Sequence, residues 1–319
     1  MVFNFVMRDG RLSARHETAQ RAVESTRMLV RFVVLVAGIA ASSGALGASP
    51  PTVKLWEWEK GIAVESVARP GMTAYLWFYE WNMFDARLPG VHTNGTYHLE
   101  RTVSCEGTTA TIVGPDMQLD LRAGTGSVDL SLRIANHSKH DWPLLASIIP
   151  CFNPGAPPSR TARYPVAKLN VQLANRRTYF VAKEGLERLV DREIHFNTAL
   201  RDEIDRLAPD GRFVFSSKWP TSNVNAHHGL LVRDSTDGKW VAGIAWENFL
   251  SAQGHNPWQC MHLAVRVGPL KQGQTKTVRG KIYLFPGNRE DCLDRFQTDF
   301  PRRTSSANSS EGALKEASN

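Results

Sequence analysis

Residues 127–136 read Ser-Val-Asp-Leu-Ser-Leu-Arg-Ile-Ala-Asn and decide the fold class of this 319-residue chain. Val128, Leu130, Leu132 and Ile134 occupy every second position, with mostly polar residues between them. Successive side chains of an extended chain point to opposite faces, so this pattern is typical of a strand with one packed and one wet face. Such strands are characteristic of antiparallel sheets.

The same alternation extends outward over residues 52–285 and is interrupted by turn sequences such as Asn94-Gly95 and Asp237-Gly238. Residues 73–81, Thr-Ala-Tyr-Leu-Trp-Phe-Tyr-Glu-Trp, are especially rich in strand-forming side chains. Further strands are expected at 98–104, 109–113, 117–122, 144–150, 177–181, 212–216, 229–233, 240–247, 261–268 and 275–285. The sequence therefore predicts a mainly β fold, a large antiparallel β-sandwich with one or two short helices.

Two segments depart from the alternation. Apolar residues recur at near-helical spacing over 186–207, before Pro209 and Gly211, and this pattern predicts a mostly helical segment. Residues 290–300 predict a second short amphipathic helix, with Leu293 and Phe296 on its apolar face.

The N-terminal segment has the order of a secretory signal peptide. Arg27 and Arg31 precede an apolar run at 32–41, and small residues follow at 42–49. The run is about half the roughly 20 residues that a membrane-spanning helix needs. We expect a leader and signal peptide over 1–48, with Met28 as an alternative start, and no stable membrane span after cleavage.

The remaining chain is expected to form a single β-sandwich domain over 49–300, secreted or otherwise extracytoplasmic. Residues 301–319 are rich in Ser, Asn, Ala and charge, with almost no large apolar side chains, which is typical of a disordered tail. The formal net charge of +7 falls to about +4 without residues 1–48, and no basic groove with interleaved aromatics is evident. Nucleic acid is therefore not an expected partner.

All four cysteines, Cys105, Cys151, Cys260 and Cys292, lie in the part expected to be exported. Two disulfides or buried thiols are both favoured over a zinc site, because no C-x-x-C pair exists and the spacings are long. The sequence predicts no metal and no other cofactor.

The first candidate cluster begins at the end of the strand at 73–81 and runs into a loop. Glu80 and Asp85 can act as an acid and base pair, and Trp77 or Trp81 can stack on a sugar ring, with His92 nearby. The alternative is that the aromatics are core and the carboxylates are solvated or paired with Arg87.

The second cluster, at 246–262, is a dense run of aromatic and hydrogen-bonding side chains that we expect to be a loop between strands, and it is the best site candidate. Its spacing H-x4-C-x-H matches no standard structural zinc pattern. A disulfide from Cys260 with satisfied buried polar groups is the alternative. The candidate residues in this segment are Glu247, Gln253, His255, Asn256, Trp258 and His262.

The third cluster places Trp219 ahead of the adjacent His227 and His228. Neighbouring strand residues point to opposite faces, so at most one of these histidines joins a pocket. Either is a candidate general base, because imidazole titrates near neutral pH. A surface histidine explains the pair equally well.

No G-x-S-x-G, H-E-x-x-H, P-loop or G-x-G-x-x-G sequence is present, which disfavours serine hydrolases, zincins, nucleotide enzymes and dehydrogenases. The run at 246–262, with the segments 268–274, 279–284 and 291–300, resembles a pattern in a family of uncharacterised secreted bacterial proteins, which implies no activity. The strand-rich body, with His195-Phe196-Asn197, is similar to the galactose-mutarotase-like β-sandwich and part of the aldose epimerase motif. This resemblance implies a carbohydrate-related function, and the chain shows no counterpart of that family's catalytic glutamate.

Three hypotheses follow. The leading one is a secreted β-sandwich that binds carbohydrate or a similar hydroxyl-rich ligand in an aromatic and histidine-lined cleft. An epimerase, lyase or hydrolase that uses His228 or His255 with Glu80, Asp85 or Glu247 is the second, and a structural or interaction protein of the cell envelope is the third. The expected ligand-binding residues are Trp81, His92, Trp219, His228, Gln253, His255, Asn256, Trp258 and His262.

Overall fold

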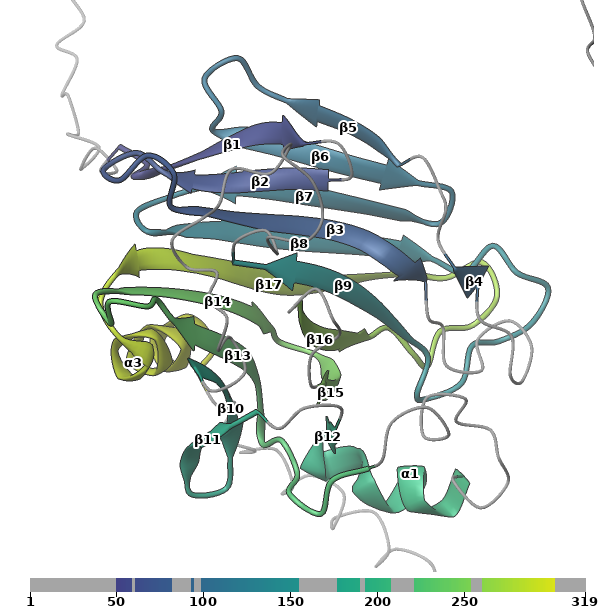
Figure 1. The fold of residues 1–319 in the computed structure, drawn as a ribbon. Helices are drawn as coiled ribbons and strands as arrows, with labels where there is room; N and C mark the ends of the chain where they lie inside the picture. The colour runs from purple at the N-terminus through teal and green to yellow at the C-terminus, as the bar shows by residue number, and fades with distance from the viewer. Residues whose placement is uncertain are drawn as a thin grey trace, which may run out of the picture. The chain divides into compact units, whose positions relative to one another are not determined.

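The computed structural model describes residues 50–58, 61–81, 93–94, 99–154, 177–189, 193–207, 221–253 and 260–301. Over these residues the chain is mainly β, with two antiparallel sheets and two α-helices (Figure 1). The predicted β-sandwich class is therefore confirmed. The two sheets share one large hydrophobic core, to which alternate residues of the strands of both contribute.

Sheet A contains eight of the described strands. Its order is β1 (Val53–Trp58), β2 (Gly61–Ser66), β3 (Thr73–Trp81), β9 (Ser147–Asn153), β16 (Met261–Arg266), β15 (Phe249–Gln253) and β12 (Ile194–Phe196), with β4 (Thr93–Asn94) pairing the end of β3.

Sheet B contains nine described strands. Its order is β11 (Gly185–Arg188), β10 (Thr178–Ala182), β13 (His228–Asp234), β14 (Trp240–Trp246), β17 (Thr275–Pro286), β8 (Ser127–Ala135), β7 (Met117–Ala123), β6 (Thr109–Gly114) and β5 (Glu100–Val103).

The alternating stretch that predicts the fold forms β8, which pairs β7 on one side and β17 on the other. Its four apolar residues are at most 3% exposed and belong to the core between the sheets. The polar residues between them point away from sheet A. Alternation therefore identified both the strand and its packed face.

Strand β9 begins three residues later than the predicted 144–150 and runs through Pro150. The ladder between β3 and β9 shifts register between Trp77 and Glu80, opposite Pro150. Proline has no N–H to donate to a neighbouring strand, which accounts for the irregularity at this point.

The expectation of a mostly helical segment over 186–207 is wrong for its first half. Leu186 lies in β11, where Gly185, at φ 126°, completes the turn from β10. Ile194 lies in β12 and pairs with β15. Only η2 (Thr198–Leu200) and α1 (Arg201–Leu207) are helical. In the folded protein the same apolar side chains pack against the sheets, and these tertiary contacts override a weak helical periodicity.

The predicted C-terminal helix is confirmed as α3 (Arg289–Asp299). Asn288 caps it by accepting hydrogen bonds from the backbone N–H groups of Glu290 and Asp291, and Asp291 accepts one in return from Asn288. Phe296 and Cys292 face the outer side of sheet B, where they join a hydrophobic cluster with β13, β14 and β17.

The segment 246–262, expected to be a loop, contains β15 over Phe249–Gln253. Every residue of β15 is buried, so the strand lacks the alternation that marks half-exposed strands. Its placement between β12 and β16 brings Gln253 and His262 into sheet A.

Candidate functional site

The outer face of sheet A, which is the face turned away from sheet B, carries three zones. Trp58, Ala63 and Tyr75 form an aromatic cluster over β1, β2 and β3, with Trp56 and Trp77 packed against it. At the other end, residues of β12, β15, β16 and α1 form an apolar cluster that includes Ile194 and Ile204. The functional candidates lie between these two clusters.

We call this middle zone the polar row. It crosses β3, β9, β16 and β15, and strand register places its members side by side: Cys151 pairs with Trp77 on one side and with His262 on the other, and His262 pairs with Gln253. All its members are at most 2% exposed. The polar row consists of Tyr75, Cys151, Asn153, Ser251, Gln253, Cys260 and His262.

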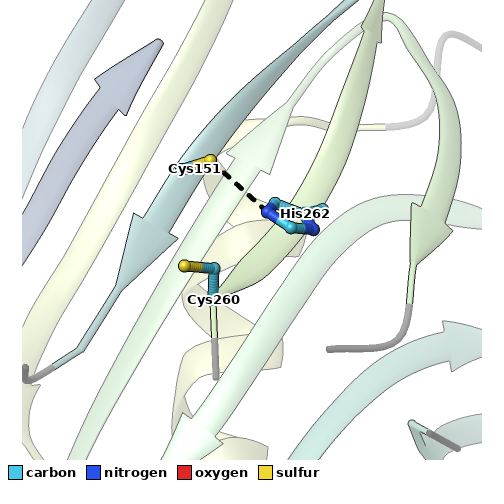
Figure 2. A group of neighbouring side chains, drawn as sticks. All are labelled: Cys151, Cys260 and His262. Carbon is cyan, nitrogen blue, oxygen red and sulfur yellow. Dashed lines mark hydrogen bonds between the residues drawn. The ribbon is translucent and has the colours of Figure 1, made fainter. Parts of the chain in front are cut away.

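Three of these side chains converge on one point. Cys151 of β9 and His262 of the adjacent β16 are joined by a hydrogen bond of 3.4 Å between Sγ and Nε2 (Figure 2). Cys260 lies just before β16, and its sulfur and the ligand atoms of the other two lie within 4.8 Å of one another. Among the described residues this is the only group of three or more His, Cys, Asp or Glu side chains placed to hold a metal ion.

Amide side chains flank the cysteine–histidine group. Asn153 Nδ2 lies 4.0 Å from Cys260 Sγ, and Gln253 Nε2 donates to Ser251 Oγ at 3.2 Å. The other amide atom of Gln253, Oε1, is buried and has no hydrogen-bond partner. The same holds for the buried polar atoms Trp56 Nε1, Thr73 Oγ1 and Ser147 Oγ, which belong to β1, β3 and β9 of sheet A.

Arg233 brings a positive charge close to this group from sheet B. It lies on β13 with the same side-chain direction as the core residue Leu231, and its Nε donates to Thr178 Oγ1 at 2.8 Å. Burial lowers the pKa of Arg233 to about 10, and the charge of Cys260 acts in the opposite direction. The guanidinium therefore stays protonated at neutral pH.

The aromatic cluster is built from edge-on contacts rather than parallel stacks. The rings of Trp58 and Trp77 are 5.3 Å apart at 64°, and those of Trp56 and Tyr75 are 6.1 Å apart at 86°. Trp56 and Trp77 are only partly buried, so the cluster presents two indole rings at the end of the polar row.

Two of the sequence-predicted ligand residues, Gln253 and His262, lie together in the polar row. Sequence reasoning missed Cys151, Asn153 and Tyr75. Tyr75 lies in a strand that the sequence predicts, but Cys151 and Asn153 follow the predicted strand at 144–150, and the pairing of β9 with β16 joins residues 111 positions apart and has no local signature.

His228 and Glu247 lie instead at sheet B. His228 starts β13 and contacts Phe296 edge-on, with ring centroids 6.1 Å apart. Glu247 follows β14, and its carboxylate accepts hydrogen bonds from the backbone N–H and the Nε of Arg279, at 2.7 and 2.9 Å. The described candidates are thus divided between the two sheets and do not meet in one hollow.

Most of the other predicted residues fall outside the described part of the chain: Asp85, His92, Trp219, His255, Asn256 and Trp258. Glu80 and Trp81 form the backbone end of β3 and pair with Asn94 and Thr93 of β4.

The fragment His195-Phe196-Asn197 has structural contacts throughout. The ring of His195 stacks on Phe180 with centroids 4.0 Å apart, and its Nδ1 lies 2.9 Å from the carbonyl oxygen of Val224. Burial lowers the pKa of His195. Asn197 caps η2 and donates to the carbonyl oxygen of Phe249. These contacts tie the edge of sheet A together and assign the fragment a packing role.

A hollow lies on the outer face of sheet B, over β6, β7, β8 and β17, with a volume of about 730 Å³. Its charged side chains neutralise one another, since Lys281 Nζ lies 3.1 Å from Asp129 and 2.8 Å from Asp299. Paired charges on a solvated sheet face account for this surface without a ligand.

No disulfide joins the four cysteines, so the expectation of disulfides is not met and the alternative of buried thiols holds for three of them. Cys105 is exposed in the turn after β5, and Cys292 is buried beneath α3 on sheet B. Only Cys151 and Cys260 share a face of one sheet, and His262 lies with them.

Neither a protein-family model nor a curated protein sequence matches the chain. Among solved structures it is similar to a polysaccharide lyase, with 9% identity and a TM-score of 0.41; the match covers 78% of this chain and only 35% of the lyase. It is also similar to a putative aldose 1-epimerase from Escherichia coli K12, with 9% identity, a TM-score of 0.36 and coverage of 74% and 100%.

A galactose mutarotase related enzyme from Lactobacillus acidophilus has 9% identity and a TM-score of 0.35, over 76% of this chain and 97% of that one. These neighbours include proteins of the galactose-mutarotase-like kind that the sequence resembles, at low identity, and they are carbohydrate-related by name. Within the described residues, no helix is long and apolar enough to cross a membrane.

Proposed function

We propose that this protein binds carbohydrate, or a similar hydroxyl-rich ligand, on the outer face of sheet A. The observation that carries the proposal is the continuity of the aromatic cluster with the polar row, since Cys151 is the register partner of Trp77. A sugar ring has an apolar face that packs on indole rings and a rim of hydroxyl groups that bind neutral amides and hydroxyls.

The chemistry of the row fits an uncharged ligand. Its hydrogen-bonding groups are the amides of Asn153 and Gln253, the hydroxyls of Tyr75 and Ser251, and the imidazole of His262. None of the members of the row carries a carboxylate, a guanidinium or an ammonium group. Neutral donors and acceptors match hydroxyl groups, which act in both roles.

The unpartnered polar atoms support the same face as a binding surface. Trp56 Nε1, Thr73 Oγ1, Ser147 Oγ and Gln253 Oε1 are buried without a hydrogen-bond partner. A buried polar group of this kind costs about 1–3 kcal/mol, and native proteins seldom keep several on one face without a use.

Binding is proposed rather than catalysis because the described titratable candidates are divided between two sheets. His228 and Glu247 lie at sheet B, and Glu247 is engaged by Arg279. The signal-peptide pattern predicted from the sequence of residues 1–48 leads us to propose further that binding takes place outside the cytoplasm.

The test measures retention on a panel of neutral and anionic polysaccharides by affinity electrophoresis, followed by calorimetric titration with oligosaccharides of any that bind. Trp77→Ala is the main variant and Trp56→Ala the second. We expect affinity to fall about tenfold or more, because removing an aromatic anchor typically costs above 1 kcal/mol.

Tyr179→Ala is the matched control, since Tyr179 is a partly buried aromatic on the outer face of sheet B. It should bind as the wild type does. Equal affinity of the folded Trp77→Ala variant and the wild type, or no retention by the wild type on any polysaccharide, contradicts the proposal. A His255→Ala/Trp258→Ala variant tests separately whether the segment 254–259 contributes to retention.

A further inference from the structure

The cysteine–histidine group is placed by the pairing of two central strands of sheet A. Cys151 and His262 are register partners on the central strands β9 and β16, and Cys260 is two residues before His262 on the same chain segment. Residues directly opposite each other in an antiparallel pair have Cβ atoms about 4.5–5.5 Å apart, so the backbone alone holds the two side chains together.

We infer that Cys151, Cys260 and His262 form a binding site for a soft divalent metal ion, with zinc as the ion that fits best. The inference goes beyond the proposed carbohydrate binding and does not depend on it. Two thiolates and an imidazole are the donor set that zinc prefers, whereas calcium and magnesium take oxygen ligands.

The distances fit a tetrahedral ion. With the ion about 2.3 Å from sulfur and about 2.0–2.1 Å from nitrogen, tetrahedral geometry separates ligand atoms by about 3.5–3.8 Å. Cys151 Sγ and His262 Nε2 are 3.4 Å apart, and all three ligand atoms lie within 4.8 Å of one another.

Two polar groups lie close to the sulfur of Cys260. The buried guanidinium of Arg233 interacts with it electrostatically. The side-chain amide of Asn153 also points its nitrogen at this sulfur, at 4.0 Å. A bound cation in turn balances the two thiolates, which are otherwise costly at this depth.

The described residues supply three ligands, which leaves one position of a tetrahedral ion. Three protein ligands with an open fourth position are typical of zinc sites that take water or a ligand group.

The experiment uses the full chain, purified without added metal and reduced with a phosphine, then titrated with zinc and, in parallel, with cobalt(II). We expect about one metal ion per chain by elemental analysis, and a cobalt spectrum with thiolate charge-transfer and tetrahedral d–d bands. Cys151→Ala, Cys260→Ala and His262→Ala should each weaken zinc binding more than about 100-fold, since even outer contacts to metal ligands change affinity 10–100-fold.

Cys292→Ala is the matched control, because Cys292 is as deeply buried but lies under α3 on sheet B. It should bind about one zinc ion, with the cobalt spectrum of the wild type. Zinc binding by Cys151→Ala equal to that of Cys292→Ala overturns the inference, as does a reduced wild type that takes up no metal. A Cys151–Cys260 disulfide in place of metal in protein isolated without reductant overturns it too.

A second measurement keeps the test valid if the ligand variants fail to fold. In the wild-type protein, bound zinc should slow alkylation of Cys151 and Cys260 at least tenfold, as mapped by peptide mass spectrometry, and leave Cys105 and Cys292 unchanged. Equal rates with and without zinc at all four cysteines contradict the inference. Metal uptake is measured without any polysaccharide, so a failure of carbohydrate binding leaves this result intact.

Discussion

The outer faces of the two sheets differ in how their buried polar groups are partnered. On sheet B, α3 covers β13, β14 and β17 with an apolar cluster, and most of the polar groups named at its margin are paired: Tyr283 donates to Asp299 at 2.9 Å, and Lys281 bridges Asp299 and Asp129, whereas one oxygen of Asp234, Oδ1, has no partner. On sheet A, the middle of the face buries amides, thiols, hydroxyls and an imidazole, and several polar atoms have no partner.

This difference leads to different expectations for the two faces, stability for sheet B and the proposed binding for sheet A. Satisfied polar groups around an apolar cluster add stability and hold α3 in place. Unpartnered buried polar atoms lower stability, and proteins keep such groups where binding or catalysis needs them. The two faces therefore predict opposite responses to substitution: sheet B should lose stability, and sheet A should lose function.

The largest expected effect is at the centre of the α3 contact. Phe296 is 4% exposed and packs against Phe300 and His228. Phe296→Ala leaves a cavity under the helix, so the free energy of unfolding should fall by about 3–5 kcal/mol. Urea unfolding followed by fluorescence measures this loss. A loss below about 1 kcal/mol would show that α3 is not an integral part of the sheet B core.

A smaller loss of unfolding free energy is expected at Tyr283. Its buried hydroxyl has a hydrogen-bond partner, unlike the unpartnered polar atoms on sheet A. Burial, and then the negative charge of Asp299, raise the pKa of Tyr283 far above its usual range, so the hydroxyl remains protonated and donates to the carboxylate. Tyr283→Phe removes this bond to a charged acceptor and should cost about 1.5–3 kcal/mol in urea unfolding. Unchanged stability would remove the contrast between the two faces.

The matched substitution on sheet A is Gln253→Met, which keeps the length of the side chain and removes its unpartnered oxygen. Loss of the bond to Ser251 and removal of the orphaned acceptor act in opposite directions. We expect stability within about 1 kcal/mol of the wild type, together with weaker polysaccharide retention. A destabilisation as large as that of Tyr283→Phe would mean that Gln253 stabilises the fold rather than binding a ligand.

Sequence periodicity predicted sheet B better than sheet A. The strands β6, β7, β8 and β17 alternate along much of their length, with one face packed and the other solvated, and all four were predicted close to their bounds. β15 is buried on both faces and has no alternation, so its sequence resembles that of a loop. Polar and apolar residues alternate only in a strand that has one face in contact with solvent. The strands that carry the polar row have no such solvated face, so their sequences do not alternate.

The candidate site was only half predictable for a related reason. Gln253 and His262 lie in a sequence run dense in polar and aromatic residues, and this density predicts a site there. Cys151 lies in the apolar segment of β9, and its proximity to His262 follows only from the pairing of strands far apart in sequence. Spacing rules for metal sites describe ligands on local turns, so a site assembled across a sheet has no such pattern.

The smallest expected effect concerns pH and again belongs to sheet B, at the turn between β13 and β14. The hydroxyl of Ser235, then the backbone N–H of Lys239, lower the pKa of Asp237 to about 2. Because the folded-state pKa lies below the usual value for aspartate, the ionised group adds stability above about pH 4, and this contribution disappears as the pH falls towards 2. The side chain is exposed to solvent, so screening keeps the effect to a few tenths of a kcal/mol.

Asp237→Asn should therefore lower the melting temperature slightly at pH 7 and leave it equal to that of the wild type near pH 2, as measured by calorimetry at several pH values. Gln253→Met serves as the comparison, because its neutral side chain adds no titrating group and its offset from the wild type should not vary with pH. A pH-dependent offset in Gln253→Met, with none in Asp237→Asn, would place the acid-sensitive contacts on sheet A and reverse the assignment of roles to the two faces.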